Sequence, residues 1–334
     1  MSTLFSHFFE KINQISPLEA DFTEVLDSIA LKPKTLYFYG KMPQNVVKTA
    51  KNGQTGFPER KKTVAIVGSR HNTKYGEAVA YKIAYELTRR GVIIVSGLAH
   101  GIDSIGHRAC LDAGGTTIAV LGTPIDQIYP KAHLGLAAEI IEKGGAVMSE
   151  YPPLSPDYAD APLAPTEYYD EAGHRTRDAR AAFLYRNRLI SGLADAVVVV
   201  EAAEKSGTLS TAAHALSQGK DVYAVPGNIT SPYSQGCNAL IRQGATPVTC
   251  VNDILRDLFP DEFVRRHKVY KAQNLLGDNE IETKILSALA TGLTSGEDIM
   301  KSLRLPPELF NEFITLLEVK GRVRPLGMNN WSLC

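Results

Sequence analysis

Residues 196–212 read AVVVVEAAEKSGTLSTA, and no other stretch of the chain indicates its class of fold so strongly. The apolar run 196–200 ends at Glu201 and is typical of a strand buried on both faces. Ser206-Gly207-Thr208 then lead into a helix expected over residues 209–218. Backbone N–H groups are unpaired at a helix start and the helix dipole favours negative charge there, so this junction predicts an anion-binding loop.

A second junction of the same kind lies upstream. The apolar run Val64–Val67 leads into Gly68-Ser69-Arg70, and a helix is expected from about Tyr75. Arg70 occupies the place of the second glycine of a dinucleotide fingerprint, where it offers a planar guanidinium to a phosphate or a base. Two such loops on one sheet predict a ligand with several phosphates, either a nucleotide or a nucleic-acid strand.

Apolar strands alternate with helical stretches from residue 63 to about 259. Strands are expected at 64–67, 92–95, 117–121, 146–149, 196–201 and 222–225. Helices are expected at 77–90, 102–113, 132–143, 182–193, 209–218 and 238–243. This βαβ rhythm predicts an α/β fold, an extended Rossmann-like doubly wound parallel sheet whose ligands bind beyond the carboxyl ends of the strands.

The chain is expected to divide into several parts. Residues 1–40 are expected to form a short N-terminal helical segment with a strand candidate at 36–39. Residues 41–260 hold the extended Rossmann-like domain, in which the Pro- and Tyr-rich stretch 152–180 is expected to be a long loop. Residues 261–280 are polar and predict a linker. Residues 281–334 show three helical segments and a hairpin, the outline of a small winged-helix domain.

Composition narrows the class of protein. The 334 residues carry 36 basic and 36 acidic side chains, so nucleic-acid binding would require a local basic patch. The four cysteines are scattered, which argues against a metal site or disulfides and fits a reduced cytoplasm. Neither a signal peptide nor a membrane helix is expected. No phosphate-binding GxxxxGK[ST], HExxH or GxSxG motif is present, so neither a cofactor nor a catalytic residue is expected.

The segment Phe183-Leu184-Tyr185-Arg186-Asn187-Arg188 combines basic, amide and aromatic side chains. Arginine neutralises phosphates, asparagine bonds base edges, and aromatic rings stack on bases. The expected recognition helix of the C-terminal part, 307–319, carries Glu308, Glu312 and Glu318 and no Lys or Arg. Phosphates would repel such a helix, so this part is expected to dock a protein or regulate rather than read duplex DNA.

The order of these motifs resembles the DprA (Smf) family of DNA-processing proteins. The matching stretches are 65–70, 96–103, 115–122, 186–188, 206–212, 225–227 and 236–245. The resemblance implies a non-catalytic protein that binds and protects incoming single-stranded DNA, loads the RecA recombinase during natural transformation, and forms homodimers. It implies contacts to the strand from Gly68, Ser69 and Arg70, from Phe183, Arg186, Asn187 and Arg188, and from Ser206, Gly207 and Thr208.

The chain departs from the family pattern at three positions. His100 stands where the family often has arginine, Pro124 replaces a usual glycine, and His133 stands where asparagine is common. Two other functions stay open. The loop at Ser206 is similar to that of nucleotide-monophosphate nucleosidases of the cytokinin-activating (LOG) type, although it lacks their double glycine and catalytic glutamate. A nucleotide-sensing module is the other alternative.

Overall fold

In the computed structural model the chain forms two compact units, Met1–Leu258 and Phe259–Cys334. The structure describes residues 9, 11–44, 46–49, 55–59, 61–155, 157, 167–169, 175–260 and 276–333.

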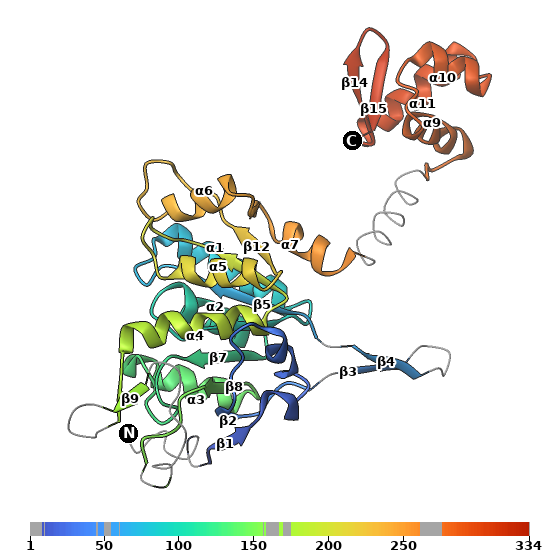
Figure 1. Ribbon diagram of the computed structural model, residues 1–334. Coiled ribbons are helices and arrows are strands. Elements are labelled where there is room, and N and C mark those ends of the chain that lie inside the picture. The colour runs from blue at the N-terminus through green and yellow to red at the C-terminus, as the bar shows by residue number, and fades with distance from the viewer. Residues whose placement is uncertain are drawn as a thin grey trace. The chain divides into compact units, whose positions relative to one another are not determined.

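A nine-stranded sheet forms the centre of the first unit (Figure 1). In spatial order its strands are β1 (Asn13–Ile15), β2 (Leu36–Gly40), β8 (Ala146–Ser149), β7 (Thr117–Leu121), β6 (Ile93–Ser96), β5 (Thr63–Val67), β11 (Ala196–Val199), β12 (Asp221–Ala224) and β13 (Thr246–Pro247). All strands from β8 to β13 pair in parallel, and β2 and β1 extend the sheet in antiparallel fashion. The predicted doubly wound parallel sheet is confirmed.

Helices cover both faces of this sheet because alternate strand residues point to opposite sides. The helices of the first unit are α1 (Lys74–Thr88), α2 (Ile102–Asp112), α3 (Leu134–Glu142), α4 (Ala179–Leu193), α5 (Thr208–Ser217), α6 (Gln235–Arg242) and α7 (Val251–Leu258), with the short 3-10 helices η2 (Pro17–Glu19), η3 (Glu24–Ser28) and η4 (Lys131–His133). Ala146 and Met148 of β8 pack in one core with α4, α5 and α6. Val147, between them, packs in a second core with α2 and α3.

The first 40 residues differ from the expectation of a separate helical segment. Strands β1 and β2 belong to the main sheet, and Phe38 of β2 pairs with Met148 of β8. The phenyl ring of Phe38 is buried in the same core as Leu189 and Ile190 of α4. The boundary expected at residue 40 is therefore wrong, since the sheet needs β2 to cover the edge of β8.

The long loop expected over residues 152–180 contains regular structure. Strand β9 (Glu167–Tyr169) pairs in antiparallel fashion with β10 (Arg175–Arg177), and α4 begins at Ala179. The stretches 158–166 and 170–174 lie outside the described residues. A second small hairpin joins β3 (Val46–Thr49) and β4 (Thr55–Glu59).

The second unit has its own apolar core. Helices α9 (Glu280–Ala290), α10 (Gly296–Leu303) and α11 (Pro307–Val319) precede a hairpin of β14 (Val323–Gly327) and β15 (Asn330–Leu333). Phe310 and Ile314 of α11 pack against Ile285 of α9 in this core. Three helices and an antiparallel hairpin are compatible with the predicted winged helix. Most of the expected linker, residues 261–275, lies outside the described residues.

Candidate nucleic-acid interface

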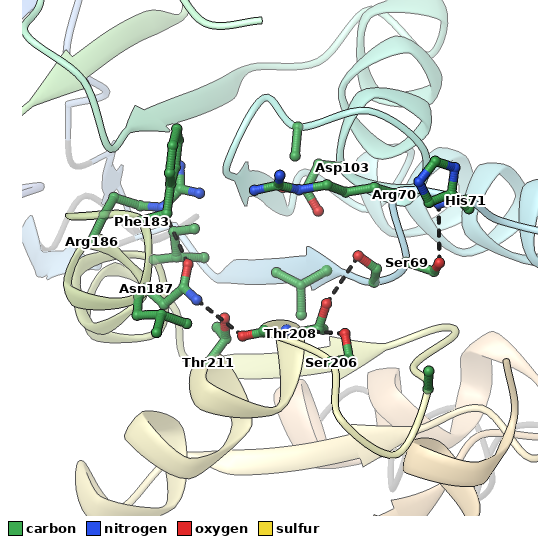
Figure 2. Close-up of a pocket in the computed structure, with 17 residues that line it drawn as sticks. Ser69, Arg70, His71, Asp103, Phe183, Arg186, Asn187, Ser206, Thr208 and Thr211 are labelled. Carbon is green, nitrogen blue, oxygen red and sulfur yellow. Dashed lines mark hydrogen bonds between the residues drawn. The ribbon is translucent and has the colours of Figure 1, made fainter. Parts of the chain in front are cut away.

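The direction of strand addition reverses between β5 and β11. From β5 the chain builds β6, β7 and β8 on one side, and from β11 it builds β12 and β13 on the other. The loops after β5 and β11 therefore separate at the carboxyl edge of the sheet, where doubly wound folds bind ligands. A pocket of about 360 Å³ opens at this point (Figure 2). Its lining is Val67, Gly68, Ser69, Arg70, His71, Ala99, Asp103, Phe183, Leu184, Arg186, Asn187, Ile190, Ala203, Ser206, Gly207, Thr208 and Thr211.

The first wall is the loop Gly68–Arg70, which hydrogen bonds hold against the neighbouring strand. The Ser69 N–H donates to the carbonyl of Glu201 (2.7 Å), just beyond β11. Gly68 is required for close packing, because a Cβ at this position would lie 2.6 Å from Cγ1 of Ile102. Arg70 extends over the pocket, and its guanidinium carbon lies 5.5 Å from the centre of the Phe183 ring (Figure 2).

The second wall is the loop Ser206–Thr208 at the start of α5. The Thr208 hydroxyl donates to the carbonyl of Gly68 (3.0 Å), so the two loops are tied together. The Thr208 and Leu209 N–H groups donate to Oγ (3.2 Å) and the carbonyl (3.1 Å) of Ser206. These amides are therefore partly used within the loop, contrary to the expectation of unpaired donors. The Ser206 and Thr208 hydroxyls are the polar side chains that this wall presents.

The floor of the pocket carries a buried guanidinium. Arg186 of α4 is 4% exposed, and its Nη1 donates to the carbonyls of Gly97 (3.0 Å) and Val120. Burial lowers the pKa of Arg186 to about 10, so it stays charged at neutral pH. Nearby, Asp103 accepts a hydrogen bond from the Gly97 N–H (3.1 Å), and burial raises the pKa of its carboxyl. Arg186 thus supplies a fixed positive potential beneath the ligand space.

Asn187 links the floor to the second wall. Its Nδ2 donates to Oγ of Ser210 (2.7 Å) and to the carbonyl of Gly207 (3.2 Å), while its Oδ1 accepts from Nε of Arg186 (3.2 Å). These bonds use both ends of the amide to hold the loop in place. The amide therefore positions Gly207 and Ser210 more than it offers free groups to a base.

Arg188 does not line this pocket with the other predicted site residues. It is 1% exposed, and its Nη2 lies 2.8 Å from both carboxylate oxygens of Glu150. Its Nε donates to the carbonyl of Leu31 (2.7 Å), and its guanidinium stacks on the ring of Tyr185 (3.8 Å). The expectation that Arg188 grips a phosphate is corrected, because its hydrogen bonds are committed to this internal network.

The sequence predicted nine of the residues that line the pocket and missed others. Gly68, Ser69, Arg70, Phe183, Arg186, Asn187, Ser206, Gly207 and Thr208 all line the pocket. His71 and Thr211 were not predicted, although His71 directly follows the first predicted loop and Thr211 lies three residues beyond the second, in α5. Within the described residues, no cluster of His, Cys, Asp and Glu is suited to a metal ion. No described helix has the length and apolar character needed to cross a bilayer.

Comparison with known proteins identifies the family of this chain. Residues 13–259 match the family model of DNA recombination-mediator protein A. The chain belongs to this family. It is 45% identical to protein Smf of Escherichia coli over 195 residues, which are 58% of this chain and 46% of that protein. It is 40% identical to the DNA processing protein DprA of Bacillus subtilis over 195 residues, again 58% of this chain and 58% of the relative. The matched chain thus spans about half the length of these relatives.

Solved structures agree with this placement. DprA from Streptococcus pneumoniae superposes with a TM-score of 0.56 at 35% identity, covering 75% of each chain. DNA processing protein A from Helicobacter pylori, whose structure addresses its single-stranded DNA binding mode, superposes with a TM-score of 0.58 at 26% identity. The latter match covers 77% of this chain and 98% of the other. The α/β fold of the first unit is therefore that of DprA proteins.

Proposed function

We propose that the pocket between the loops after β5 and β11 binds single-stranded DNA. The observation that carries this proposal is the position of Arg70, an exposed guanidinium facing the Phe183 ring across an open pocket. Arg70 has no carboxylate within ion-pairing distance among the described residues. It can therefore neutralise a phosphate while a base stacks on Phe183.

The other pocket groups suit the same ligand. The buried charge of Arg186 attracts a polyanion without fixing one phosphate. The Ser206 hydroxyl can donate a hydrogen bond to a phosphate oxygen, whereas the Thr208 hydroxyl, which donates to the Gly68 carbonyl, can only accept one. These groups recognise the backbone and the base faces rather than base edges. We expect the protein to bind single strands with little sequence preference.

We further propose that the bound strand is protected and passed to the RecA recombinase during natural transformation, with the protein acting as a non-catalytic homodimer. Membership of the DprA family supports this role. The test is single-turnover loading of RecA onto a single strand coated with single-strand-binding protein, with and without this protein. Unchanged RecA filament formation would contradict the proposal.

Replacing Arg70 tests the binding site itself. Arg70→Ala should weaken binding to oligonucleotides of every sequence and reduce the slope of log K against log salt by about 0.7, the loss of one single-strand phosphate contact. Arg90→Ala is the matched control, because this exposed arginine follows α1 and precedes β6, at the opposite edge of the sheet. An Arg70→Ala slope equal to that of the control would contradict the assignment.

The nucleosidase and nucleotide-sensing alternatives predict different results. Release of adenine from AMP would support the first, and tighter binding of mononucleotides than of an oligonucleotide would support the second. If the protein instead binds single strands, we expect that no free base is released from AMP and that an oligonucleotide displaces bound mononucleotides. Asp103 is the sole carboxylate in the pocket lining. It is buried beneath the ligand space, where it accepts a hydrogen bond from the Gly97 N–H.

A further inference from the structure

A second hollow opens beside the main pocket and shares part of its wall. It is lined by Arg70, Gly97, Ala99, His100, Tyr129, Pro130, Phe183 and Arg186. Arg70, Ala99, Phe183 and Arg186 line both spaces, so the two are neighbours. The hollow measures about 20 Å³, which is room for a water molecule but not for a base. A base at this place must therefore lie on the rim of the hollow.

Aromatic rings make up that rim. The Tyr129 side chain is 48% exposed, and its ring centre lies 5.4 Å from that of Phe183 at an angle of 47°. His100, which also lines the hollow, is exposed, and its ring centre lies 4.7 Å from that of His133. We call Tyr129, Phe183 and His100 the aromatic shelf. Arg70 lies at its edge, since its guanidinium faces the same Phe183 ring.

The loop that carries Tyr129 is anchored on both sides of it. Ile128 and Pro130 are buried. The Thr123 hydroxyl donates to the carbonyl of Gln127 (2.6 Å), and the His133 N–H donates to that of Pro130 (2.9 Å). An exposed ring on an anchored loop loses little conformational entropy on binding, so it is well suited to stacking.

We propose that the aromatic shelf is a second subsite, which stacks the base of the nucleotide next to the one held in the main pocket. This inference rests on the proposed single-strand binding. Arg70 stands between the two subsites, where the phosphate that joins the two nucleotides would lie. Stacking accepts every base, so the shelf lengthens the binding site without adding sequence preference.

Substitutions of Tyr129 distinguish this subsite from the main pocket. Tyr129→Ala should weaken binding of an oligothymidylate by about fivefold or more, which corresponds to the loss of one stacked base. Tyr129→Phe should bind nearly as the parent does, because the ring is retained. Tyr81→Ala is the matched control: this tyrosine is 40% exposed on α1 and lines neither space. Thymidine 5′-monophosphate, which fills one subsite, should bind the parent and Tyr129→Ala equally.

A fluorescence measurement tests the stacking directly. The chain has a single tryptophan, Trp331, which lies in the second unit. The tryptophan fluorescence of Tyr129→Trp should decrease as oligonucleotide is added and then reach a plateau. This decrease should be larger than any change in the fluorescence of the parent. The subsite would be overturned if the oligonucleotide did not quench Tyr129→Trp, or if Tyr129→Ala bound the oligonucleotide as tightly as the parent. The proposed single-strand binding would still hold in that case, provided that Arg70→Ala weakens binding. If the parent bound no single strand, both the proposed function and the subsite would be contradicted.

Discussion

The protonation of one buried histidine follows from the hydrogen bonds around it. The Thr117 hydroxyl donates to the carbonyl of Ile94 (2.8 Å), so it can only accept from Nδ1 of His107 (2.7 Å). The neutral Nδ1–H form is therefore present, and Nε2 has no hydrogen-bond partner among the described groups. Burial lowers the pKa of His107 from 6.5 to about 3, because nothing compensates the imidazolium for lost water.

This histidine makes stability depend on pH. Between pH 6.5 and about 3 the unfolded chain binds a proton at His107 that the folded chain does not. The free energy of unfolding should therefore fall by up to about 1.4 kcal/mol per pH unit as the pH decreases through this range. His107→Asn, whose amide can still donate to Thr117, should lose this component of the slope. Urea unfolding of both proteins from pH 7 to pH 4 is the measurement, and parallel slopes would contradict the prediction.

Arg188 should prove structural rather than ligand-binding. Arg188→Ala leaves the Glu150 carboxylate buried without its partner, which should cost about 3–5 kcal/mol of unfolding free energy. The fraction that remains folded should bind single-stranded DNA as the parent does. Denaturant unfolding and oligonucleotide titration of the same variant provide the two readouts. Parental stability combined with weakened binding would return Arg188 to the ligand site.

The position of Arg188 was foreseeable from helix geometry. A helix turns by about 100° per residue, so Arg186 and Arg188 lie about 200° apart and cannot face one pocket. The sequence shows two basic side chains on this helix, and the error was to expect both of them to face the same pocket. The exposure of Tyr129 could not be predicted in this way, because it depends on a loop held by contacts to Leu98 and to the strand ends.

At the scale of elements, the buried parallel strands and the strand at 36–39 were predictable, but the place of that strand in the main sheet and the strand β1 were not. Runs such as 118–121 and 146–148 are continuously apolar, which marks a strand covered on both faces. Strand β1 is only three residues long, and β2 pairs with β8 far along the chain. Pairing over such a separation leaves no local pattern, so the role of residues 36–40 became clear only in the sheet.

Helix α11 allows a prediction about the second unit. The carboxylates of Glu308, Glu312 and Glu318 are exposed on this helix, and it carries no basic residue. A fragment of residues 276–334, which contains the unit's own core, should not bind duplex DNA measurably because phosphates repel these carboxylates. Replacing the three glutamates with glutamine tests whether their charge is the cause. Tight duplex binding by the unaltered fragment would contradict the prediction.

At the scale of the whole molecule, the pocket proposed to bind single strands is lined by residues of the first unit. Every residue that lines the main pocket precedes Leu258. A chain that ends at Leu258 should therefore bind single-stranded oligonucleotides within about threefold of the full chain, a difference below 1 kcal/mol. Titration by fluorescence anisotropy at fixed salt provides the comparison. A loss of tenfold or more would show that the second unit contributes to the site.

The parallel pairing of β5 with β11 also sets when the site can exist. Val67 and Val199 lie side by side in the sheet, although more than a hundred residues separate them along the chain. A ribosome must synthesise and release the chain beyond Thr208 before both walls can meet. The nascent protein should thus be unable to bind single-stranded DNA until late in translation. DNA binding can therefore report that β5 and β11 have paired.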